Sequence, residues 1–268
     1  MACSSPSPSG CSSHSNQGWP SMSEAVVLTT HGLVKEFAAG GRRPTLYRTL
    51  RSALRQGARD EGRLRSLDDI NIVIRAGELV GLVGDNGAGK TTLLKTIAGL
   101  YAPTRGRVEV HGEVALLAGL GVGMIDELSV ADNIHLYGAV CGLYRKTIRE
   151  HLDEIVAWAE LEGFVDAELR TLARGMQTRL AFAIAMHIAS DLILMDEAFS
   201  TGDKRFQEKC DLYFRDSKRL RRTALLATHN LEFVKEFCDR TLWLHKGKQM
   251  AFGPTAVVLA EYLEFAAT

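Results

Sequence analysis

The sequence predicts an α/β fold in which helices flank a mostly parallel sheet and a helical subdomain is inserted into the chain. Short apolar runs at Leu79–Val83, Leu192–Met195 and Thr223–Thr228 are typical of strands buried in a parallel sheet. Segments with helical periodicity separate these runs, and the pattern from Glu127 to Ser190 is mostly helical. This alternation around a helical insertion indicates an α/β core with a helical subdomain at about residues 125–190.

The composition argues against several classes of protein. Lys+Arg and Asp+Glu both number 32, so the net charge is zero and no global field attracts nucleic acid; we expect no nucleic-acid partner. The five cysteines have no metal-ligand spacing, which favours reduced thiols in a cytosolic compartment. No apolar run approaches the length of a membrane span, so any span is expected to come from a partner.

The chain begins with a Ser- and Pro-rich segment, residues 1–22, that has little apolar surface to bury, and we expect it to be disordered. This segment lacks the basic start and the apolar stretch of a secretory signal, and Met22 is an alternative start. The folded domain is expected over residues 23–268, with a first short strand near Ala25–Leu28.

A strongly basic insertion is expected at residues 42–66. Within it Leu46, Leu50 and Leu54 recur every four residues, while arginines occupy another face. This pattern predicts an amphipathic basic helix, which suits either a membrane surface or an acidic partner. A solvated surface helix accounts for the same pattern equally well. A strand is expected next at Ile70–Ile74.

A glycine-rich loop follows the Leu79–Val83 strand and opens into a segment with helical propensity. Its residues are Gly84, Asp85, Asn86, Gly87, Ala88, Gly89, Lys90, Thr91 and Thr92. Glycines let backbone N–H groups converge on phosphate oxygens, and the helix N-terminus adds partial positive charge. We expect Lys90 to reach the β/γ-phosphates and the Thr91 hydroxyl to ligate Mg²⁺. The sequence therefore predicts a P-loop NTPase core that binds a nucleoside triphosphate.

Two carboxylates, Asp196 and Glu197, end the Leu192–Met195 strand. Ligands of open α/β sheets sit at the carboxyl ends of the strands, so both acids are expected to face the phosphate loop. Asp196 is placed to hold Mg²⁺, and Glu197 is placed to act as general base on the attacking water. His229 ends the next buried strand, where it can contact the γ-phosphate, although a lone histidine is more often structural.

The last apolar strand is expected at Thr241–Leu244, followed by a turn at Lys246–Lys248. A closing helix is expected over about Pro254–Phe265.

The order of phosphate loop, acid pair and histidine, with a helical subdomain between the first two, resembles the nucleotide-binding subunits of ABC transporters. Leu172–Gln177 stands where that family has its signature motif. The resemblance, which covers the chain from about residue 25, implies an ATP-hydrolysing homodimer with an antiparallel β region at the N-terminus of each copy. It also implies that two ATP molecules with Mg²⁺ are held between the two copies. Nucleotide contacts are implied for Ala173, Arg174, Gly175, Met176 and Asp203.

A narrower resemblance is to the ATPases that export polysaccharides such as O-antigen, capsule and teichoic acid. It rests on Asp196–Asp203, Phe206-Gln207, Lys209-Cys210, the Gly119–Met124 segment and the basic insertion. It implies a separately encoded membrane permease and a peripheral position on the cytoplasmic face of the cytoplasmic membrane. Some members carry a C-terminal carbohydrate-binding domain, and because the chain ends at Thr268 we expect none here.

Two positions depart from the family pattern. Ala173 stands where the signature usually has a serine, and no glutamine occurs between Lys90 and Met176 to ligate Mg²⁺. Both departures predict slow or partner-dependent hydrolysis. An aromatic ring near the first strand usually stacks on the adenine in this family; Phe37 is the first candidate, a core residue being an equal alternative, and Tyr47 is the second.

Other functions fit parts of the pattern. An ABC subunit that moves a lipid, a drug or a small solute would share every motif except the segments that carry the narrower resemblance. A soluble ABC-type ATPase acting on ribosomes or DNA usually has two ATPase modules or coiled-coil arms, whereas this chain has one phosphate loop and no heptad run. A small-molecule kinase would not need Leu172–Gln177.

Overall fold

The computed structural model describes residues 25–38, 63–118, 121–188, 190–196 and 204–267. The strands are β1 (Val26–Ala38), β2 (Arg63–Ile70), β3 (Val73–Arg75), β4 (Leu79–Val83), β5 (Arg105–Val110), β6 (Val114–Ala118), β7 (Leu192–Asp196), β8 (Ala224–Ala227), β9 (Arg240–His245) and β10 (Lys248–Pro254). The helices are α2 (Lys90–Ile97), α3 (Val130–Val140), α4 (Arg145–Ala159), α5 (Arg174–Met186), α6 (Lys204–Arg219), α7 (Leu231–Phe237) and α8 (Thr255–Ala266), with a 3₁₀ turn η1 (Leu169–Thr171).

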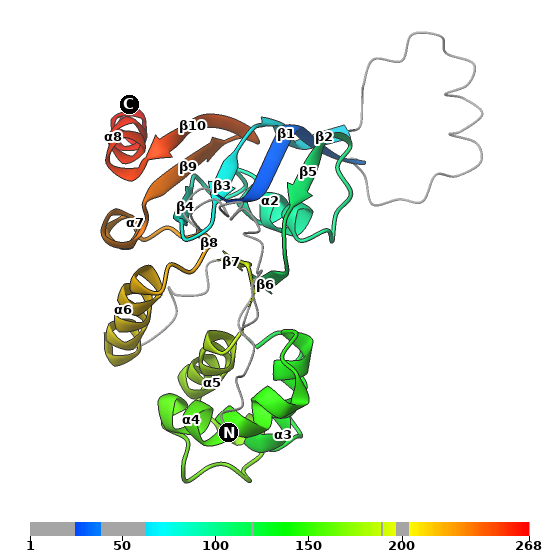
Figure 1. The fold of residues 1–268 in the computed structure, drawn as a ribbon, viewed down its shortest axis with the longest axis vertical. Helices are drawn as coiled ribbons and strands as arrows, with labels where there is room; N and C mark the ends of the chain where they lie inside the picture. Colours follow the sequence, from blue (N-terminus) through cyan, green and yellow to red (C-terminus); the bar gives the residue numbers. More distant parts are fainter. Residues whose placement is uncertain (1–24, 39–62, 119–120, 189, 197–203, 268) are drawn as a thin grey trace, which may run out of the picture.

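The strands form one sheet with the order β3-β1-β2-β10-β9-β4-β8-β7-β6, and β5 pairs with β1 (Figure 1). The strands β9, β4, β8, β7 and β6 are parallel to their neighbours in that run. By contrast, β1 pairs antiparallel with β2, β3 and β5. The predicted α/β fold with an N-terminal antiparallel region is therefore confirmed.

The two faces of the parallel sheet belong to two separate hydrophobic clusters. In β4, Leu79 and Val83 belong to the cluster shared with α3–α8, whereas Val80 and Leu82 belong to the cluster shared with α2 and the antiparallel strands. Successive side chains of a strand point to opposite faces, so a continuous apolar run serves both clusters. This double burial explains why the strands were recognisable as apolar runs without alternation.

The helices α3, α4 and α5 form a subdomain at the end of the molecule opposite the antiparallel strands (Figure 1). Ser129 caps α3, its hydroxyl accepting from the backbone N–H of Asp132 at 3.0 Å. The fully buried Asn133 donates to the carbonyls of Ile125 and Leu128 and accepts from the N–H of Ile125. Asn133 thereby holds the segment before α3 in a fixed position. In the part of the chain with described structure, no helix has both the length and the apolarity of a membrane span.

Two strand predictions were wrong in their boundaries. The first strand is long, Val26–Ala38, because β1 pairs with three different strands along its length. The predicted strand Ile70–Ile74 is instead divided between β2 and β3. The chain bends there: Asp69 has a φ of +59°, and the side chain of Asn71 donates to the Asp69 carbonyl at 3.1 Å. Strands β5, β6 and β10 were not predicted.

The basic insertion predicted at residues 42–66 lies mostly outside the described residues, as does the predicted disordered tail, residues 1–22. Its described end is not helical, because Arg63 and Arg65 belong to β2. Both guanidinium groups pair with Glu36 on β1, at 3.5 and 3.0 Å. These two arginines therefore bind within the antiparallel region.

In the described part of the chain, Cys141, Cys210 and Cys238 form no disulfide. Burial raises the pKa of the Cys210 thiol to about 12 and that of Cys141 to about 11. Both thiols therefore stay protonated and unreactive at neutral pH.

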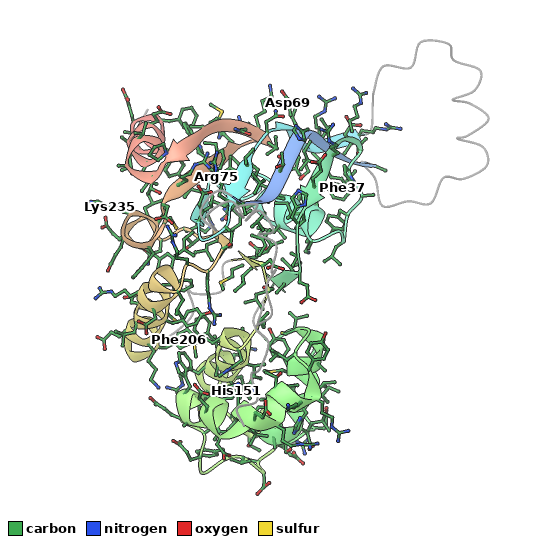
Figure 2. All side chains as sticks on the ribbon, in the orientation of Figure 1. Phe37, Asp69, Arg75, His151, Phe206 and Lys235 are labelled. Atoms are coloured by element: carbon green, nitrogen blue, oxygen red, sulfur yellow. The ribbon has the colours of Figure 1, made fainter. Side chains whose placement is uncertain are left out.

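Helix α6 fastens the helical subdomain to the sheet domain. Lys209 on α6 lies 2.7 Å from a carboxylate oxygen of Glu160, donates to the carbonyl of Trp158 at 2.9 Å and lies over the Trp158 ring. Phe206, labelled in Figure 2, is buried, and its ring lies edge-on against that of Phe182 of α5. Two of the residues behind the narrower family resemblance, Phe206 and Lys209, therefore hold α6 against α4 and α5.

Replacing Lys209 with methionine is expected to lower the free energy of unfolding by about 1–3 kcal/mol, because a half-buried Glu160 carboxylate keeps only its longer pair with Arg179 and the Trp158 carbonyl loses the Lys209 donor. Lys146→Met is the matched control, since its pair with Glu150 is exposed and should contribute less than about 0.5 kcal/mol. Urea denaturation of both variants checks this. Equal urea midpoints for the Lys209→Met and Lys146→Met proteins would contradict a stabilising role of Lys209.

Candidate functional site

A pocket of about 440 Å³ lies at the carboxyl end of β4, where the loop of residues 84–89 leads into α2. Its lining residues are Leu64, Ser66, Asp85, Asn86, Gly87, Ala88, Gly89, Lys90, Thr91 and Thr92. The loop residues predicted from sequence thus come together around one cavity, with Gly84 directly behind them at the end of the strand.

The loop glycines are required by the backbone. Gly84 has a φ of +146°, and a Cβ atom at this position would lie 2.2 Å from the carbonyl oxygen of Leu244. Gly89, the N-cap of α2, has a φ of +106° and no capping side chain. The N-terminus of α2 is therefore open towards the pocket, and its partial positive charge favours an anion there.

Lys90 brings a positive charge into the pocket. The residue is 5% exposed, and its Nζ donates to the carbonyl oxygens of Gly84 at 2.7 Å and Asp85 at 3.4 Å. The same Nζ lies 3.3 Å from Nε2 of His229. Because an ammonium group has no lone pair, His229 accepts in this contact. The structure thus joins the predicted loop lysine to the predicted histidine.

His229 is held at the tip of β8 by a short turn. The N–H of Asn230 donates to the Thr228 hydroxyl at 3.1 Å, and the Asn230 side chain accepts from the N–H of Phe233 to cap α7. His229 itself is exposed. These hydrogen bonds of Thr228 and Asn230 fix the backbone on both sides of His229, whose imidazole lies 3.3 Å from the loop lysine.

In the register of the sheet, Asp196 is level with the residues that stand two positions before Gly84 and two positions before His229. Leu82, Ala227 and Asp196 are register partners on the adjacent parallel strands β4, β8 and β7. Among the described residues, the buried Oδ1 atom of Asp196 finds no hydrogen-bond partner. A buried carboxylate oxygen is costly unless a cation or a donor satisfies it. This orphaned oxygen fits a hard divalent cation such as Mg²⁺, and the hydroxyl of Thr91, the other predicted ligand, is a hard oxygen donor on the pocket wall.

Glu197 and Asp203 lie outside the described residues, as does Tyr47. The places of these three predicted residues in the site stay predictions.

The segment Ala173–Met176 starts α5 on the helical subdomain. Ala173, Arg174 and Gly175 are exposed, whereas Met176 is partly buried. Gln177 anchors the segment by donating to the carbonyls of Leu169 and Leu172 at 3.0 and 3.2 Å. Ala173 is the N-cap and supplies no side-chain bond, so the first turn of α5 presents backbone N–H groups to the surface.

Phe37 lies on β1 opposite Leu64 of β2, in the upper part of Figure 2. Its ring is half-buried, meets Tyr101 edge-on and lies under the ammonium group of Lys35. In the described part of the chain, Leu64 rather than Phe37 lines the pocket. Adenine stacking on Phe37 stays a prediction.

Leu64 and Ser66 were missed by sequence reasoning. The Ser66 hydroxyl donates to Oγ1 of Thr92 at 2.9 Å, and Leu64 is 63% exposed at the mouth of the pocket. Both reach the loop through the pairing of distant strands, for which the local sequence has no signal.

Comparison with known proteins bears on this site. The model of the ABC transporter family matches residues 67–200, half of the 268 residues. The O-antigen export system ATP-binding protein RfbB of Myxococcus xanthus is 37% identical over 91% of this chain and 57% of its own length. The teichoic acids export ATP-binding protein TagH of Lactococcus lactis is 37% identical over 80% of this chain and 46% of its own length. The chain thus spans about half the length of these two relatives.

An RfbB protein of Klebsiella pneumoniae is 34% identical over 74% of this chain and 80% of its own length. Among solved structures, an ATP-binding subunit of an ABC transporter has a TM-score of 0.69 at 22% identity and covers 88% of this chain and 93% of its own. A dimeric ATP-binding cassette with bound ADP and Pi has a TM-score of 0.67 at 22% identity and covers 85% and 98%. At these identities the structural likeness shows the fold.

Ala173→Ser is expected to raise the free energy of unfolding by about 1 kcal/mol, because a serine hydroxyl at the N-cap can accept from the first turn of α5. The matched control is Arg174→Ser, which adds the same hydroxyl one residue later, where it does not cap. Urea denaturation checks the difference. A gain of equal size in both variants would show that capping is not its cause.

Proposed function

The chain belongs to the ABC transporter family, and on that premise we propose that it binds ATP with Mg²⁺ and hydrolyses it to drive export of a cell-envelope polysaccharide or lipid-linked glycan. The observation that supports the chemistry is the convergence of Lys90, His229 and Asp196 at the carboxyl ends of three adjacent strands. The choice of a glycan rests on the relatives, which are named as O-antigen and teichoic acid export proteins.

Each residue has a role in this proposal. The loop N–H groups and the N-terminus of α2 bind the phosphates, and Lys90 exchanges its contacts with loop carbonyls for the β/γ-phosphate oxygens. Thr91 and Asp196 would hold Mg²⁺, which would supply positive charge to neutralise the phosphates. Once Lys90 turns to phosphate, His229 can contact the γ-phosphate. Glu197, next to Asp196 in the chain, orients and deprotonates the attacking water.

A second copy of the chain would complete the site. Gly175 occupies the first turn of α5, and glycine has a lower helix propensity than alanine. Within the described part of this chain nothing requires it, because a Cβ there would meet no atom within 4 Å. Close approach of a group from outside the chain explains the glycine, and the phosphates held by the partner copy are the group we propose. Exposed Ala173 and Arg174 lie at the same surface.

The proposed assembly includes a separately encoded integral membrane permease. The ATPase would bind it peripherally on the cytoplasmic face of the cytoplasmic membrane. ATP binding closes the pair of subunits and hydrolysis reopens them, so the nucleotide shifts the permease between two conformations. The same cycle would serve a lipid, drug or small-solute substrate.

Gly175→Gln is expected to leave folding and ATP binding by the single chain unchanged, because the new side chain enters open space. ATP hydrolysis should fall by about 100-fold, since the side chain blocks donors that face the transferred phosphate. In a Glu197→Gln background, size-exclusion chromatography with ATP should show a dimer that the added Gly175→Gln change abolishes.

Gly163→Gln is the matched control, because this glycine is also exposed and a Cβ atom added to it would meet no described atom within 4 Å. It should keep both hydrolysis and the dimer. A Gly175→Gln protein that dimerises and hydrolyses ATP normally would refute the shared site.

The glycan assignment is tested in the cell. Deletion of the gene should remove an envelope polysaccharide from the cell surface and leave its lipid-linked precursor inside, and the wild-type gene but not Lys90→Ala should restore it. Unchanged surface glycan in the deletion strain would favour the lipid, drug or solute alternative.

A further inference from the structure

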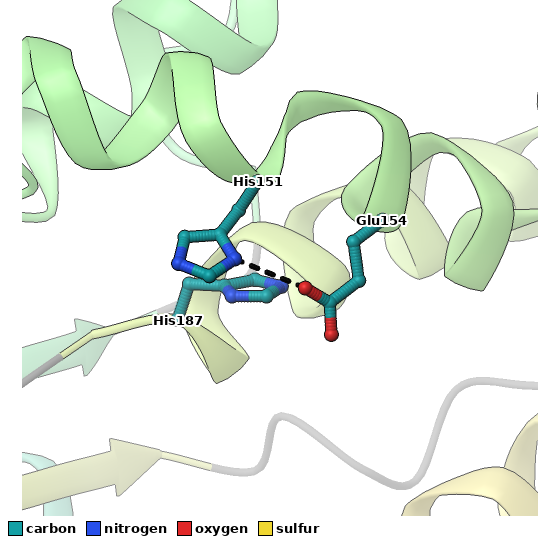
Figure 3. A group of neighbouring side chains, drawn as sticks. All are labelled: His151, Glu154 and His187. Atoms are coloured by element: carbon teal, nitrogen blue, oxygen red, sulfur yellow. Dashed lines mark hydrogen bonds and ion pairs between the residues drawn. The ribbon is translucent and has the colours of Figure 1, made fainter.

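A cluster of two histidines and one glutamate lies on the helical subdomain, apart from the phosphate loop. His151 and Glu154 are on α4, and His187 is the C-cap residue of α5 (Figure 3). We propose that His151, Glu154 and His187 form a binding site for one divalent transition-metal ion of the Zn²⁺ class.

Helical spacing places the first two ligands on one face of α4. His151 and Glu154 are three residues apart, and Nδ1 of His151 lies 3.0 Å from Oε2 of Glu154. The ring of His187 lies beneath the ring of His151, with centroids 4.7 Å apart and planes tilted by 31°. One donor atom from each residue lies within 4.8 Å of the others. The side chains thus already converge on one point between the helices.

His187 gives an independent indication of a ligand. Its Nε2 atom is buried and has no hydrogen-bond partner among the residues whose structure is described. A buried ring nitrogen without a partner is costly, and buried polar atoms of native proteins are nearly always satisfied. Packing against α4 does not supply a partner, so an ion held jointly with the other two residues is the group that we infer.

The ligand set decides the class of ion. Two imidazoles and one carboxylate suit Zn²⁺ and its neighbours in the first transition row, whereas Mg²⁺ and Ca²⁺ take oxygen ligands. At Zn–N and Zn–O distances of about 2.0–2.2 Å, tetrahedral donors stand roughly 3.3 Å apart. Contraction from the present spacing needs only side-chain rotation of His151 and Glu154, both of which are substantially exposed. Water would take the fourth position.

Of the three proposed ligands, Glu154 is the one whose negative charge contributes to binding the ion. Arg222, which donates to the Met186 carbonyl at 3.2 Å, brings a positive charge close to His187. The carboxylate of Glu154 supplies the negative charge that offsets it. The ion would also link α4 to the C-terminal end of α5, the helix that starts with Ala173–Met176 at its other end.

The test uses the full chain without an affinity tag, freed of metal with a chelator and then titrated with Co²⁺ and Zn²⁺. One ion per chain should bind, Co²⁺ should develop visible absorption bands, and saturating Zn²⁺ should raise the melting temperature, since the ion binds the folded state. Glu154→Gln keeps the shape of an exposed side chain and should weaken binding by at least tenfold, as should His151→Ala and His187→Ala.

The matched controls are His31→Ala and His111→Ala, which remove exposed histidines elsewhere. Both should bind Co²⁺ as the wild type does. Two results would overturn the proposal: no binding at one ion per chain, or binding that is undiminished in Glu154→Gln and in the His151→Ala/His187→Ala double variant. Because ATP takes no part, this outcome is independent of the proposed ATPase activity.

Discussion

The functional site depends on a positive charge that the fold buries at one edge of the sheet. Lys90 is nearly inaccessible, and its ammonium group contacts two loop carbonyls and His229. A buried ammonium is tolerated only where acceptors surround it, and carbonyl oxygens accept its hydrogen bonds without carrying a full negative charge. The surrounding backbone depends on Gly84, since any other residue would collide with the Leu244 carbonyl. This constraint explains why strand, glycine and lysine occur together, and why an anion suits the pocket.

The helical subdomain is connected to that edge by a small number of specific contacts. Glu160 lies at the left-handed C-cap of α4 and pairs with Lys209 of α6 and Arg179 of α5. The buried ring of Phe206 packs beside Trp158 and Phe182. The helix α5 therefore lies between two surfaces of different chemistry. Its N-terminal end exposes Gly175 to an outside partner, and its C-terminal end meets α4 at the proposed metal cluster.

The parts of the site that were predictable share a local signature. To identify the Gly84–Thr92 loop from the sequence, it was enough to recognise a buried strand before it and a helix after it, and the structure contains both. His229 was distinguished from the other histidines by its place after a strand, and its contact with Lys90 supports that reasoning. Phe37 was chosen by analogy and stays a prediction, whereas Leu64, which lines the pocket, was not chosen at all. The break at Asp69–Ile72 was missed because the Asn71 side chain donates to the Asp69 carbonyl and accepts from the N–H of Gly32 on β1, which the apolar pattern does not encode.

By itself the sequence determined the α/β class, the buried parallel strands β4, β7 and β8 and the identity of the phosphate loop, since these follow from hydrophobic periodicity and residue spacing within short windows. Only the tertiary structure decided which distant residues share a site. Ser66 beside Thr92, Lys209 on Glu160, and His187 beside His151 each join segments that are far apart in the chain. Such contacts result from strand pairing and helix packing, whose partners are selected by the burial of whole faces rather than by any local pattern of residues.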